Sequence, residues 1–251
     1  MDTRRFEGRS VLVTGGGSGI GHATAVAFGR EGGRVLVADL NADAAGAVAQ
    51  EVRAAGGVAD SLQVDATDEA AVARMVGEAA RLHGPLRHAF NNVGLSRDGT
   101  LESMTRADWD WTLATSLTST FLGMKHEVPA LRAAGGGTIV NTASMSGKIH
   151  VSAASPAYSA AKAAVIHLSL CASTAHAAEG IRVNSVSPGL TATPLIAQMF
   201  SPEQQGAIAG AHQAIARAVT PEEIAATVLF LSSDEAAMIT GRDIEVAGGR
   251  R

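Results

Sequence analysis

A chain of 251 residues with 46% hydrophobic residues suits one large α/β domain or two small ones, and the simpler expectation is a single domain over residues 1–251. Its net charge of −4 comes from interspersed acids and bases, which argues against nucleic acid or an anionic membrane as a partner. The one cysteine excludes an intramolecular disulfide, and no cysteine and histidine group has the spacing of a metal site. Without an apolar leader or a run near the ~20 apolar residues that span a bilayer, we expect a cytoplasmic protein.

Short apolar or β-branched runs alternate with longer alanine-rich segments of helical period along the whole chain. Strands are predicted over 10–15, 34–40, 59–66, 86–94, 137–144, 181–189 and 242–249. Helices are predicted over 21–32, 42–56, 68–84, 106–135, 157–180 and 221–234. This alternation indicates a doubly wound α/β fold with a parallel sheet and helices on both faces, whose ligands bind beyond the carboxyl ends of the strands. We expect Cys171, in an apolar helical stretch, to be buried.

The first predicted strand runs into a glycine-rich turn, TGGGSGIG, which opens the first helix. Glycine permits positive φ angles and lets a phosphate approach the backbone, and the helix N-terminus attracts an anion. A glycine pattern alone is weak, but its place between strand and helix in a βαβ unit favours a dinucleotide site over a plain turn. We assign to this site Gly15, Ser18, Gly19, Ile20 and Gly21.

Asp39 ends the second strand, 18 residues after Gly21. This is near the spacing of about 20 residues expected of an acid that binds the adenosine ribose. Its charge would repel a 2′-phosphate and residues 16–18 include no base, so we predict NAD rather than NADP. Asp65 and Ala66 follow the third strand and are candidates for contact with the adenine, although a helix N-cap role for a neighbouring acid competes.

The only tyrosine, Tyr158, lies four residues before Lys162, which is one of three lysines. Residues i and i+4 share a helix face, so the ammonium group can lie beside the phenol. A tyrosine pKa near ~10 is too high for a base at neutral pH, but a cation about 5 Å away contributes roughly 3 kcal/mol, or about 2 pKa units, towards the phenolate. We therefore predict that Tyr158 exchanges a proton and that Lys162 lowers its pKa.

Ser144 ends the strand that precedes this helix, 14 residues before Tyr158. Taken alone, a serine at a strand end is usually structural. Beside Tyr158, Lys162 and a cofactor turn, its hydroxyl can donate to a substrate oxygen while the tyrosine transfers the proton and a nicotinamide transfers hydride. We assign Ser144, Tyr158 and Lys162 to this reaction.

These motifs, in this order, resemble the short-chain dehydrogenase/reductase family over essentially the whole chain. The resemblance rests on TGGGSGIG, Asp39, Asp65, NNVG at 91–94, Ser144, YSAAK at 158–162, NSVSPG at 184–189 and Thr193. It implies a Rossmann-type domain. It also implies that further residues hold the cofactor, namely Asn92, Gly94, Pro188, Gly189, Leu190 and Thr193, together with Tyr158 and Lys162.

Three positions depart from the family pattern. The resemblance places a catalytic asparagine within 106–135, where this chain has Ser116. We expect Ser116 to kink the helix and to keep a working but altered proton relay through water. Val93 stands where alanine is frequent, a change that we expect to be tolerated, and Ala247 stands where aspartate is frequent, which we expect to loosen a contact between subunits.

By the resemblance, the segment 190–217 folds over the substrate. Its apolar residues include Leu195, Ile196, Met199, Phe200 and Ile208. With one acid and one base in the segment, this composition favours a neutral, largely apolar secondary alcohol or ketone. The same residues are also compatible with the core of a small helical pair. The helices around 107–131 and 157–179 have apolar and small residues on more than one face, and such helices pair between subunits in the family, so we expect a homotetramer.

The sequence therefore predicts an NAD-dependent short-chain alcohol dehydrogenase or ketone reductase acting on a small molecule. One alternative is a 3-oxoacyl-[acyl-carrier-protein] reductase, which Asp39 disfavours because those reductases usually use NADPH. Another is a non-catalytic NAD-sensing or scaffold protein. Ser116 favours that alternative, and the intact Ser144, Tyr158 and Lys162 set opposes it.

Overall fold

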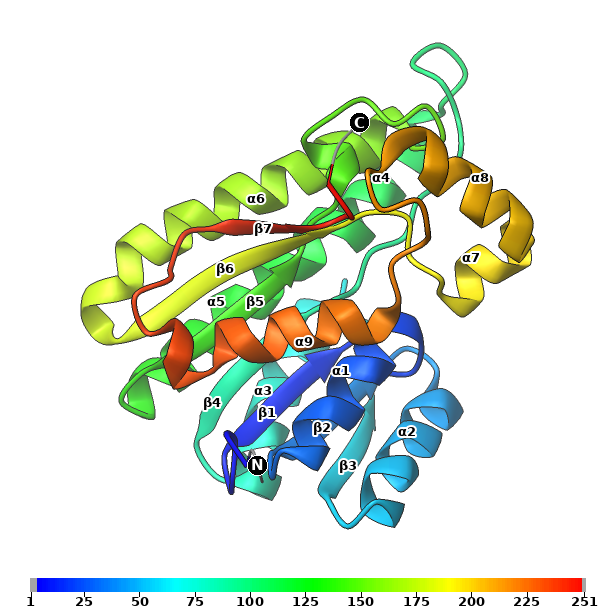
Figure 1. Ribbon diagram of the computed structural model, residues 1–251. Helices are drawn as coiled ribbons and strands as arrows, with labels where there is room; N and C mark the ends of the chain where they lie inside the picture. The colour runs from blue at the N-terminus through cyan, green and yellow to red at the C-terminus, as the bar shows by residue number, and fades with distance from the viewer. Residues whose placement is uncertain (1–3, 250–251) are drawn as a thin grey trace.

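Seven strands form one parallel sheet in the order β3-β2-β1-β4-β5-β6-β7 in the computed structural model, which describes residues 4–249 (Figure 1). The strands are β1 (Ser10–Thr14), β2 (Arg34–Asp39), β3 (Val58–Gln63), β4 (Leu86–Asn91), β5 (Gly137–Thr142), β6 (Ile181–Pro188) and β7 (Asp243–Val246). The order reverses between β1 and β4, which places a crevice at their carboxyl ends. The predicted doubly wound, Rossmann-type α/β fold is confirmed.

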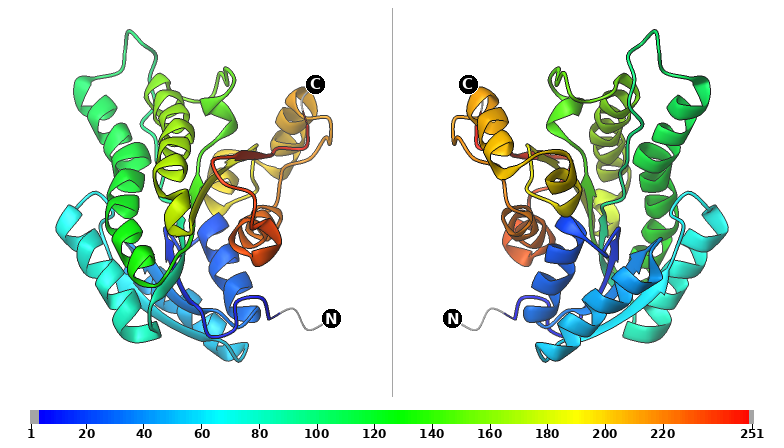
Figure 2. Two further views of the ribbon diagram at one scale, coloured as in Figure 1. Left: turned by 90° about the vertical axis from the view of Figure 1, so that its left-hand side faces the viewer. Right: turned by 90° about the vertical axis from the view of Figure 1, so that its right-hand side faces the viewer.

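Helices cover both faces of the sheet (Figure 2). They are α1 (Gly19–Arg30), α2 (Ala42–Ala54), α3 (Glu69–His83), α4 (Arg106–Leu113), α5 (Ser119–Ala133), α6 (Pro156–His176), α7 (Pro194–Met199), α8 (Pro202–His212) and α9 (Pro221–Ser232). One hydrophobic core lies between the sheet and α1, α2 and α9, and a second lies between the sheet and α3, α5 and α6. Both faces of the sheet are therefore buried, as a parallel sheet requires.

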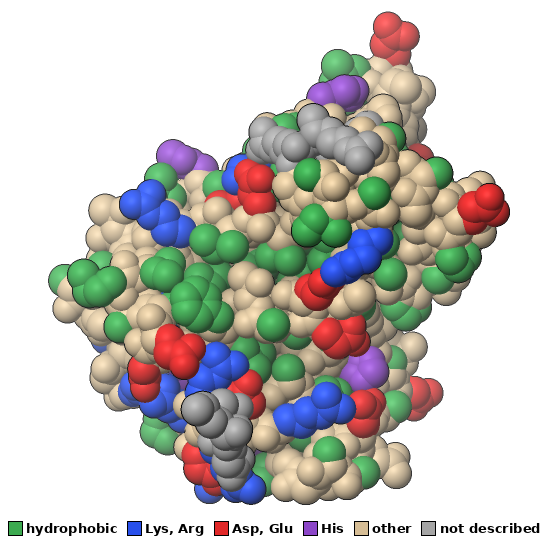
Figure 3. All heavy atoms as spheres, viewed as in Figure 1, with side chains coloured by type: hydrophobic (Ala, Val, Ile, Leu, Met, Phe, Trp, Pro, Cys, Tyr) green, Lys and Arg blue, Asp and Glu red, His purple; other side chains and the backbone are tan. Residues whose placement is uncertain are grey.

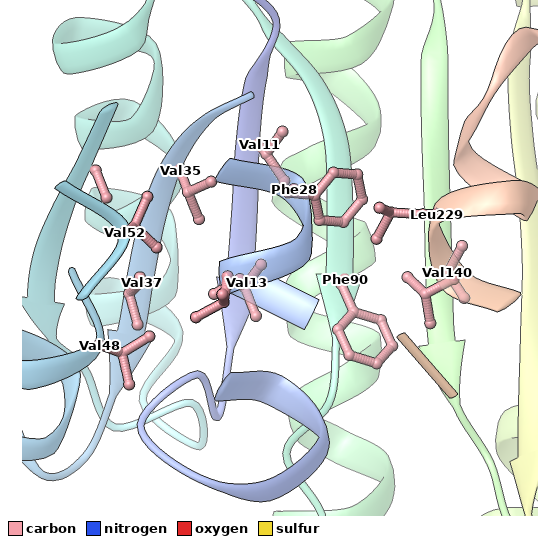
Figure 4. Packing of buried hydrophobic residues seen from close by; sticks show 14 of the residues in the cluster. Val11, Val13, Phe28, Val35, Val37, Val48, Val52, Phe90, Val140 and Leu229 are labelled. Carbon is pink, nitrogen blue, oxygen red and sulfur yellow. The ribbon is translucent and has the colours of Figure 1, made fainter. Parts of the chain in front are cut away.

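The strand residues alternate between the two cores. Val11 and Val13 of β1 point to the α1 side, where they share one cluster with Phe28 (Figure 4). Leu12, between them, belongs to the opposite core. Val35 and Val37 of β2 repeat the pattern beside β1. This period of two is the geometry of a strand with a core on each side, and it fixes the register of the central strands.

The helix predicted over 106–135 is interrupted in the middle. A π-helical turn, η1 (Ala114–Thr118), separates α4 from α5. The Thr115 hydroxyl donates to the Trp111 carbonyl oxygen at 3.1 Å, and Ser116 lies at the centre of the turn. Hydroxyl groups that bond to the preceding turn bend helices, and π turns are frequent at functional sites. The helix is therefore interrupted at Ser116, but the hydroxyl that bonds the preceding turn is that of Thr115, while the Ser116 hydroxyl bonds outside the helix, to the Leu95 carbonyl.

The surface agrees with the mixed charge of the sequence. On the face shown in Figure 3, acidic and basic side chains are interspersed. Within residues 4–249, no helix combines the length and the apolar character needed to cross a membrane. The expectation that Cys171 is buried is wrong, because it lies on the exposed side of α6 next to Leu170, which is 44% exposed. The apolar residues of α6 surround the helix, so an apolar neighbourhood in sequence does not identify the buried side.

Candidate active site

The predicted phosphate-binding turn joins the carboxyl end of β1 to α1. Gly15 and Gly19 adopt φ angles of +59° and +53°, which other residues rarely adopt. A Cβ on Gly21 would lie 2.1 Å from the Gly15 carbonyl oxygen, so turn and helix are in direct backbone contact. Ser18 precedes the helix and makes no side-chain cap bond to it, and Ile20 packs against the core. The geometry leaves the first amides of α1 directed at the turn, as an anion site requires.

Asp39 closes one side of this turn. Its Oδ2 accepts a hydrogen bond from the Gly17 amide at 2.9 Å, and its Oδ1 accepts one from the Asn41 amide at 2.9 Å. A Cβ on Gly17 would lie 2.9 Å from the same carboxylate, which explains why glycine occupies this position. The acid and the glycine turn therefore form one unit at the ends of β1 and β2.

Asp65 and Asp68 have separate roles after β3. Asp65 is exposed and accepts hydrogen bonds from the amide and hydroxyl of Thr67, at 2.8 and 2.7 Å. Asp68 is the N-cap of α3, so the capping role predicted for a neighbouring acid belongs to it. Ala66 lines a cavity of about 10 Å³ together with Val93, which brings the third strand end to the NNVG segment.

Asn92 connects three strand ends. Its Nδ2 donates to the Gly15 carbonyl at 3.2 Å, and its Oδ1 accepts a hydrogen bond from the Thr142 hydroxyl at 3.1 Å. Two residues further, Gly94 faces Lys162, because a Cβ there would lie 2.7 Å from the lysine Nζ. The NNVG segment thus spans the distance from the glycine turn to the predicted catalytic lysine.

Lys162 and Tyr158 lie together on α6, as predicted. The Lys162 Nζ is 5.6 Å from the centre of the Tyr158 ring and donates to the Thr142 carbonyl at 2.7 Å. Lys162 is 1% exposed, and burial lowers its pKa to about 7. Burial also raises the pKa of Tyr158, and a hydrogen bond from Ser144 opposes this shift. The pKa of Tyr158 is therefore raised rather than lowered in this structure, because desolvation outweighs the Ser144 hydrogen bond. The lowering expected from the charge of Lys162 stays a prediction.

Ser144 stands beside the tyrosine at the end of β5. Its oxygen accepts hydrogen bonds from the amide of Ser146 at 3.2 Å and from the hydroxyl of Ser146 at 2.9 Å. These bonds leave the Ser144 proton free to point towards Tyr158 or a substrate oxygen. Sequence reasoning missed Ser146, although the serine pair two residues apart is visible in the sequence.

Sequence reasoning also missed Ser155, the N-cap of α6. Its hydroxyl oxygen accepts a hydrogen bond from the Tyr158 amide at 3.3 Å and lies 2.8 Å from the Ser96 hydroxyl. Ser155 therefore connects the helix turn that carries the tyrosine to the segment after NNVG. The serine before Pro156 at a helix start is a readable capping signal.

Ser116 is fully buried in the π-helical turn between α4 and α5. Its hydroxyl donates to the Leu95 carbonyl at 2.7 Å, and the Thr115 hydroxyl donates to the same oxygen at 3.1 Å. A Cβ on Gly94 would lie 3.7 Å from the Ser116 oxygen. Ser116 thus holds the segment that packs against Lys162. In this structure it acts on the site by positioning that segment.

The residues after β6 complete the crevice at the carboxyl ends of the strands, which we call the groove. Gly189 donates its amide to the Val246 carbonyl at 3.0 Å, and the Leu190 carbonyl accepts from the Val219 amide at 2.8 Å. A Cβ on Gly19 would lie 3.1 Å from the methyl group of Thr193, so the segment after Pro188 contacts the glycine turn. The predicted cofactor residues from both halves of the chain therefore meet at one edge of the sheet.

The segment 190–217 forms α7 and α8, which stand beyond the sheet edge in Figure 1. Leu195 and Met199 are 53% and 58% exposed. Such exposure does not fit the core of a helical pair, and of the apolar residues in α7 and α8 only Ala209 is among the buried residues of the described chain. The apolar side chains are therefore available at the surface near the groove.

Taken together, the backbone cradle of the glycine turn, the Asp39 carboxylate and the Asn92 link fit a dinucleotide. Bound there, its phosphates would meet Ser18, Gly19 and Ile20, its adenosine would meet Asp39, Asp65 and Ala66, and its nicotinamide end would meet Gly94, Lys162 and the 188–193 segment. The proton-handling side chains lie at that second end.

Comparison with known proteins agrees with this architecture. A family model described as enoyl-(acyl carrier protein) reductase matches residues 15–251. Cyclohexanol dehydrogenase of Acinetobacter sp. is 38% identical over 247 residues, covering 98% of this chain and 96% of that protein. The 3-oxoacyl-[acyl-carrier-protein] reductase of Thermotoga maritima is 33% identical over 245 residues, covering 98% of each chain.

Among solved structures, a 7α-hydroxysteroid dehydrogenase in complex with NADH and 7-oxoglycochenodeoxycholic acid superposes with a TM-score of 0.93 at 30% identity, covering 99% of this chain and 96% of that chain. Fold, motif order and whole-length similarity agree with the resemblance seen in the sequence. The chain belongs to the short-chain dehydrogenase/reductase family of oxidoreductases, which use nicotinamide cofactors.

Proposed function

We propose that this protein is an NAD(H)-dependent dehydrogenase that interconverts a neutral, largely apolar secondary alcohol and its ketone. The observation that carries the proposal is the meeting of Ser144, Tyr158 and buried Lys162 beside Gly94, at the far end of the groove from the glycine turn. A hydroxyl donor, a phenol and an amine in this order suit proton exchange with a substrate oxygen.

The preference for NAD rests on Asp39. The carboxylate is held by two backbone amides at the position where an adenosine ribose would lie, so its charge cannot swing away from a 2′-phosphate without losing both bonds. Residues 16–18 include no positive side chain to offset that repulsion.

The residues of the site divide the proton chemistry among themselves. In alcohol oxidation, Tyr158 accepts the hydroxyl proton while Ser144 donates a hydrogen bond to the same substrate oxygen, held in this orientation by Ser146. Lys162, fixed by the Thr142 carbonyl, stabilises the phenolate when it carries a proton. A bound nicotinamide supplies the hydride acceptor or donor for the carbon atom. In ketone reduction each proton step runs in reverse.

The exposed apolar side chains of α7 support an apolar substrate, and similarity to a cyclohexanol dehydrogenase supports a cyclic one. Similarity to a 3-oxoacyl-[acyl-carrier-protein] reductase favours that activity as the second candidate. A homotetramer and a cytoplasmic location stay predictions. Exposed Phe121 on α5 and Leu170 on α6 support an assembly through these helices.

The test compares oxidation of cyclic and open-chain secondary alcohols by the wild type and Tyr158→Phe, with NAD and with NADP. We expect turnover of cyclic alcohols with NAD and a loss of about 100-fold or more in kcat for Tyr158→Phe. Equal rates in the two proteins would remove Tyr158 from the mechanism. A preference for NADP together with reduction of 3-oxoacyl thioesters would support the second candidate. Binding of NAD without turnover of any alcohol or ketone would instead indicate a sensor protein.

A further inference from the structure

The turn that carries Ser144 belongs to neither a strand nor an α-helix, so contacts with other elements must fix its position. We call residues 144–148 the serine turn. Inside it, the Gly147 amide donates to the Ser144 carbonyl at 3.0 Å and the Lys148 amide donates to the Met145 carbonyl at 3.0 Å. These bonds shape the turn, but they do not connect it to the rest of the protein.

On one side, the serine turn lies directly on α6. A Cβ on Gly147 would lie 2.6 Å from the Ala163 nitrogen and 2.6 Å from the Lys162 carbonyl carbon. The backbone of the turn therefore touches the backbone of the helix one turn after Tyr158. A shift of the turn along or away from α6 would change the separation of the Ser144 and Tyr158 hydroxyl groups.

On the other side, Lys148 connects the turn to the edge of the sheet. Its Nζ lies 3.0 Å from the Asp243 carboxylate and 2.6 Å from the Glu245 carboxylate, both on β7. Asp243 also accepts hydrogen bonds from the hydroxyl groups of Ser185, at 2.6 Å, and Ser187, at 2.8 Å, on β6. Lys148 thus joins the serine turn to the two strands that lead into the Pro-Gly turn and the C-terminus.

The burial of the Asp243 carboxylate distinguishes this ion pair from an ordinary surface pair. The Asp243 side chain is 7% exposed and the Lys148 side chain is 25% exposed. Lys125 and Glu69, by contrast, are 47% and 49% exposed, so water screens their attraction. A carboxylate as deeply buried as Asp243 needs a cationic partner, and removal of that partner forces a local rearrangement.

We propose that Lys148 is a positioning residue that clamps the serine turn between α6 and the β6–β7 edge and thereby sets the place of the Ser144 hydroxyl relative to Tyr158. The inference rests on the proposed function, because the position of Ser144 matters to turnover only if Ser144 and Tyr158 handle the substrate oxygen. No sequence pattern reveals the contact between Lys148 and Asp243, since the two residues are 95 positions apart in the chain.

The test compares Lys148→Met with Lys125→Met, which removes the exposed lysine, in the full-length protein. We expect kcat for alcohol oxidation to fall about 10- to 100-fold in Lys148→Met, with NAD binding unchanged and Lys125→Met like the wild type. The Ser144 hydrogen bond lowers the pKa of Tyr158, so a displaced Ser144 should also move the acidic limb of the kcat profile to higher pH. A purely structural role would leave that limb in place.

Amide hydrogen exchange in the peptide that spans residues 145–149 gives a readout independent of activity. We expect faster exchange there in Lys148→Met only. Should this variant fail to fold, Lys148→Met with Asp243→Asn removes the unpaired carboxylate and should show the same losses. Unchanged exchange in the turn, or a kcat and pH profile like those of Lys125→Met, would overturn the clamp while leaving the proposed function intact. A wild type that oxidises no alcohol would overturn the proposed function, and the exchange rates would still decide whether the clamp exists.

Discussion

Replacing Glu127 with glutamine would remove the titration of a carboxyl group sealed inside the protein. Glu127 lies on α5 and is 0% exposed. Its Oε2 accepts a hydrogen bond from the Asn91 amide group at 2.9 Å, and its Oε1 has no hydrogen-bond partner within the described chain. Burial raises the pKa of Glu127 to about 7, and the Asn91 hydrogen bond offsets only part of the effect.

The size of the effect follows from the two pKa values. The carboxyl group has a pKa of 4.5 without these surroundings and about 7 in the folded protein. Between these pH values the folded state binds more protons than the unfolded state. The contribution of Glu127 to the free energy of unfolding is therefore complete below pH 4.5 and is lost as the pH rises through 7. At about 1.4 kcal/mol per pKa unit, the complete loss from this one group is about 3.5 kcal/mol.

Urea unfolding of both proteins at about pH 5 and pH 8, at one protein concentration, measures this effect. We expect the free energy of unfolding of Glu127→Gln, relative to the wild type, to rise by about 2.5 kcal/mol over this range, because part of the titration lies below pH 5. In the place of Oε1, the glutamine amide brings two N–H donors without a partner into the core, which lowers stability by about 1–3 kcal/mol at both pH values. Glu69→Gln is the control, since Lys125 lowers the pKa of that exposed carboxyl. A difference that stays constant from about pH 5 to pH 8 would refute a buried, protonated Glu127.

Two further substitutions test the groove. Gly94→Ala places a methyl group 2.7 Å from the Lys162 Nζ, so we expect kcat/KM to fall about tenfold or more in steady-state kinetics. The control is Gly77→Ala, whose added methyl group meets nothing within 4 Å and should leave kcat/KM unchanged. Asp39→Ala removes the charge that would repel a 2′-phosphate, so the ratio of kcat/KM with NAD to that with NADP should fall about tenfold or more; an unchanged ratio would show that cofactor choice lies elsewhere.

The sequence predicted those features of the fold that depend on local pattern. The period of two in VLV and the alanine-rich helical segments identified every strand and most helices, and the parallel order then placed Gly15, Asp39 and Ser144 at one edge. Features that depend on distant contacts were not predicted. The direction of the Tyr158 pKa shift depends on how much protein surrounds the phenol, and the exposure of Cys171 depends on which side of α6 meets the sheet.

The two pKa shifts in the site also explain why Ser144 must be held so firmly. Burial raises the pKa of Tyr158 and lowers that of Lys162, so desolvation favours the neutral form of both groups and works against the phenolate that alcohol oxidation needs. Within the described chain, the contact that lowers the pKa of Tyr158 is the hydrogen bond from Ser144. Because such a bond weakens steeply with distance and angle, the acidity of the tyrosine depends on where the serine turn lies. Ser146 and Lys148, which touch no substrate in this mechanism, therefore influence the proton transfer through the geometry of one hydroxyl group.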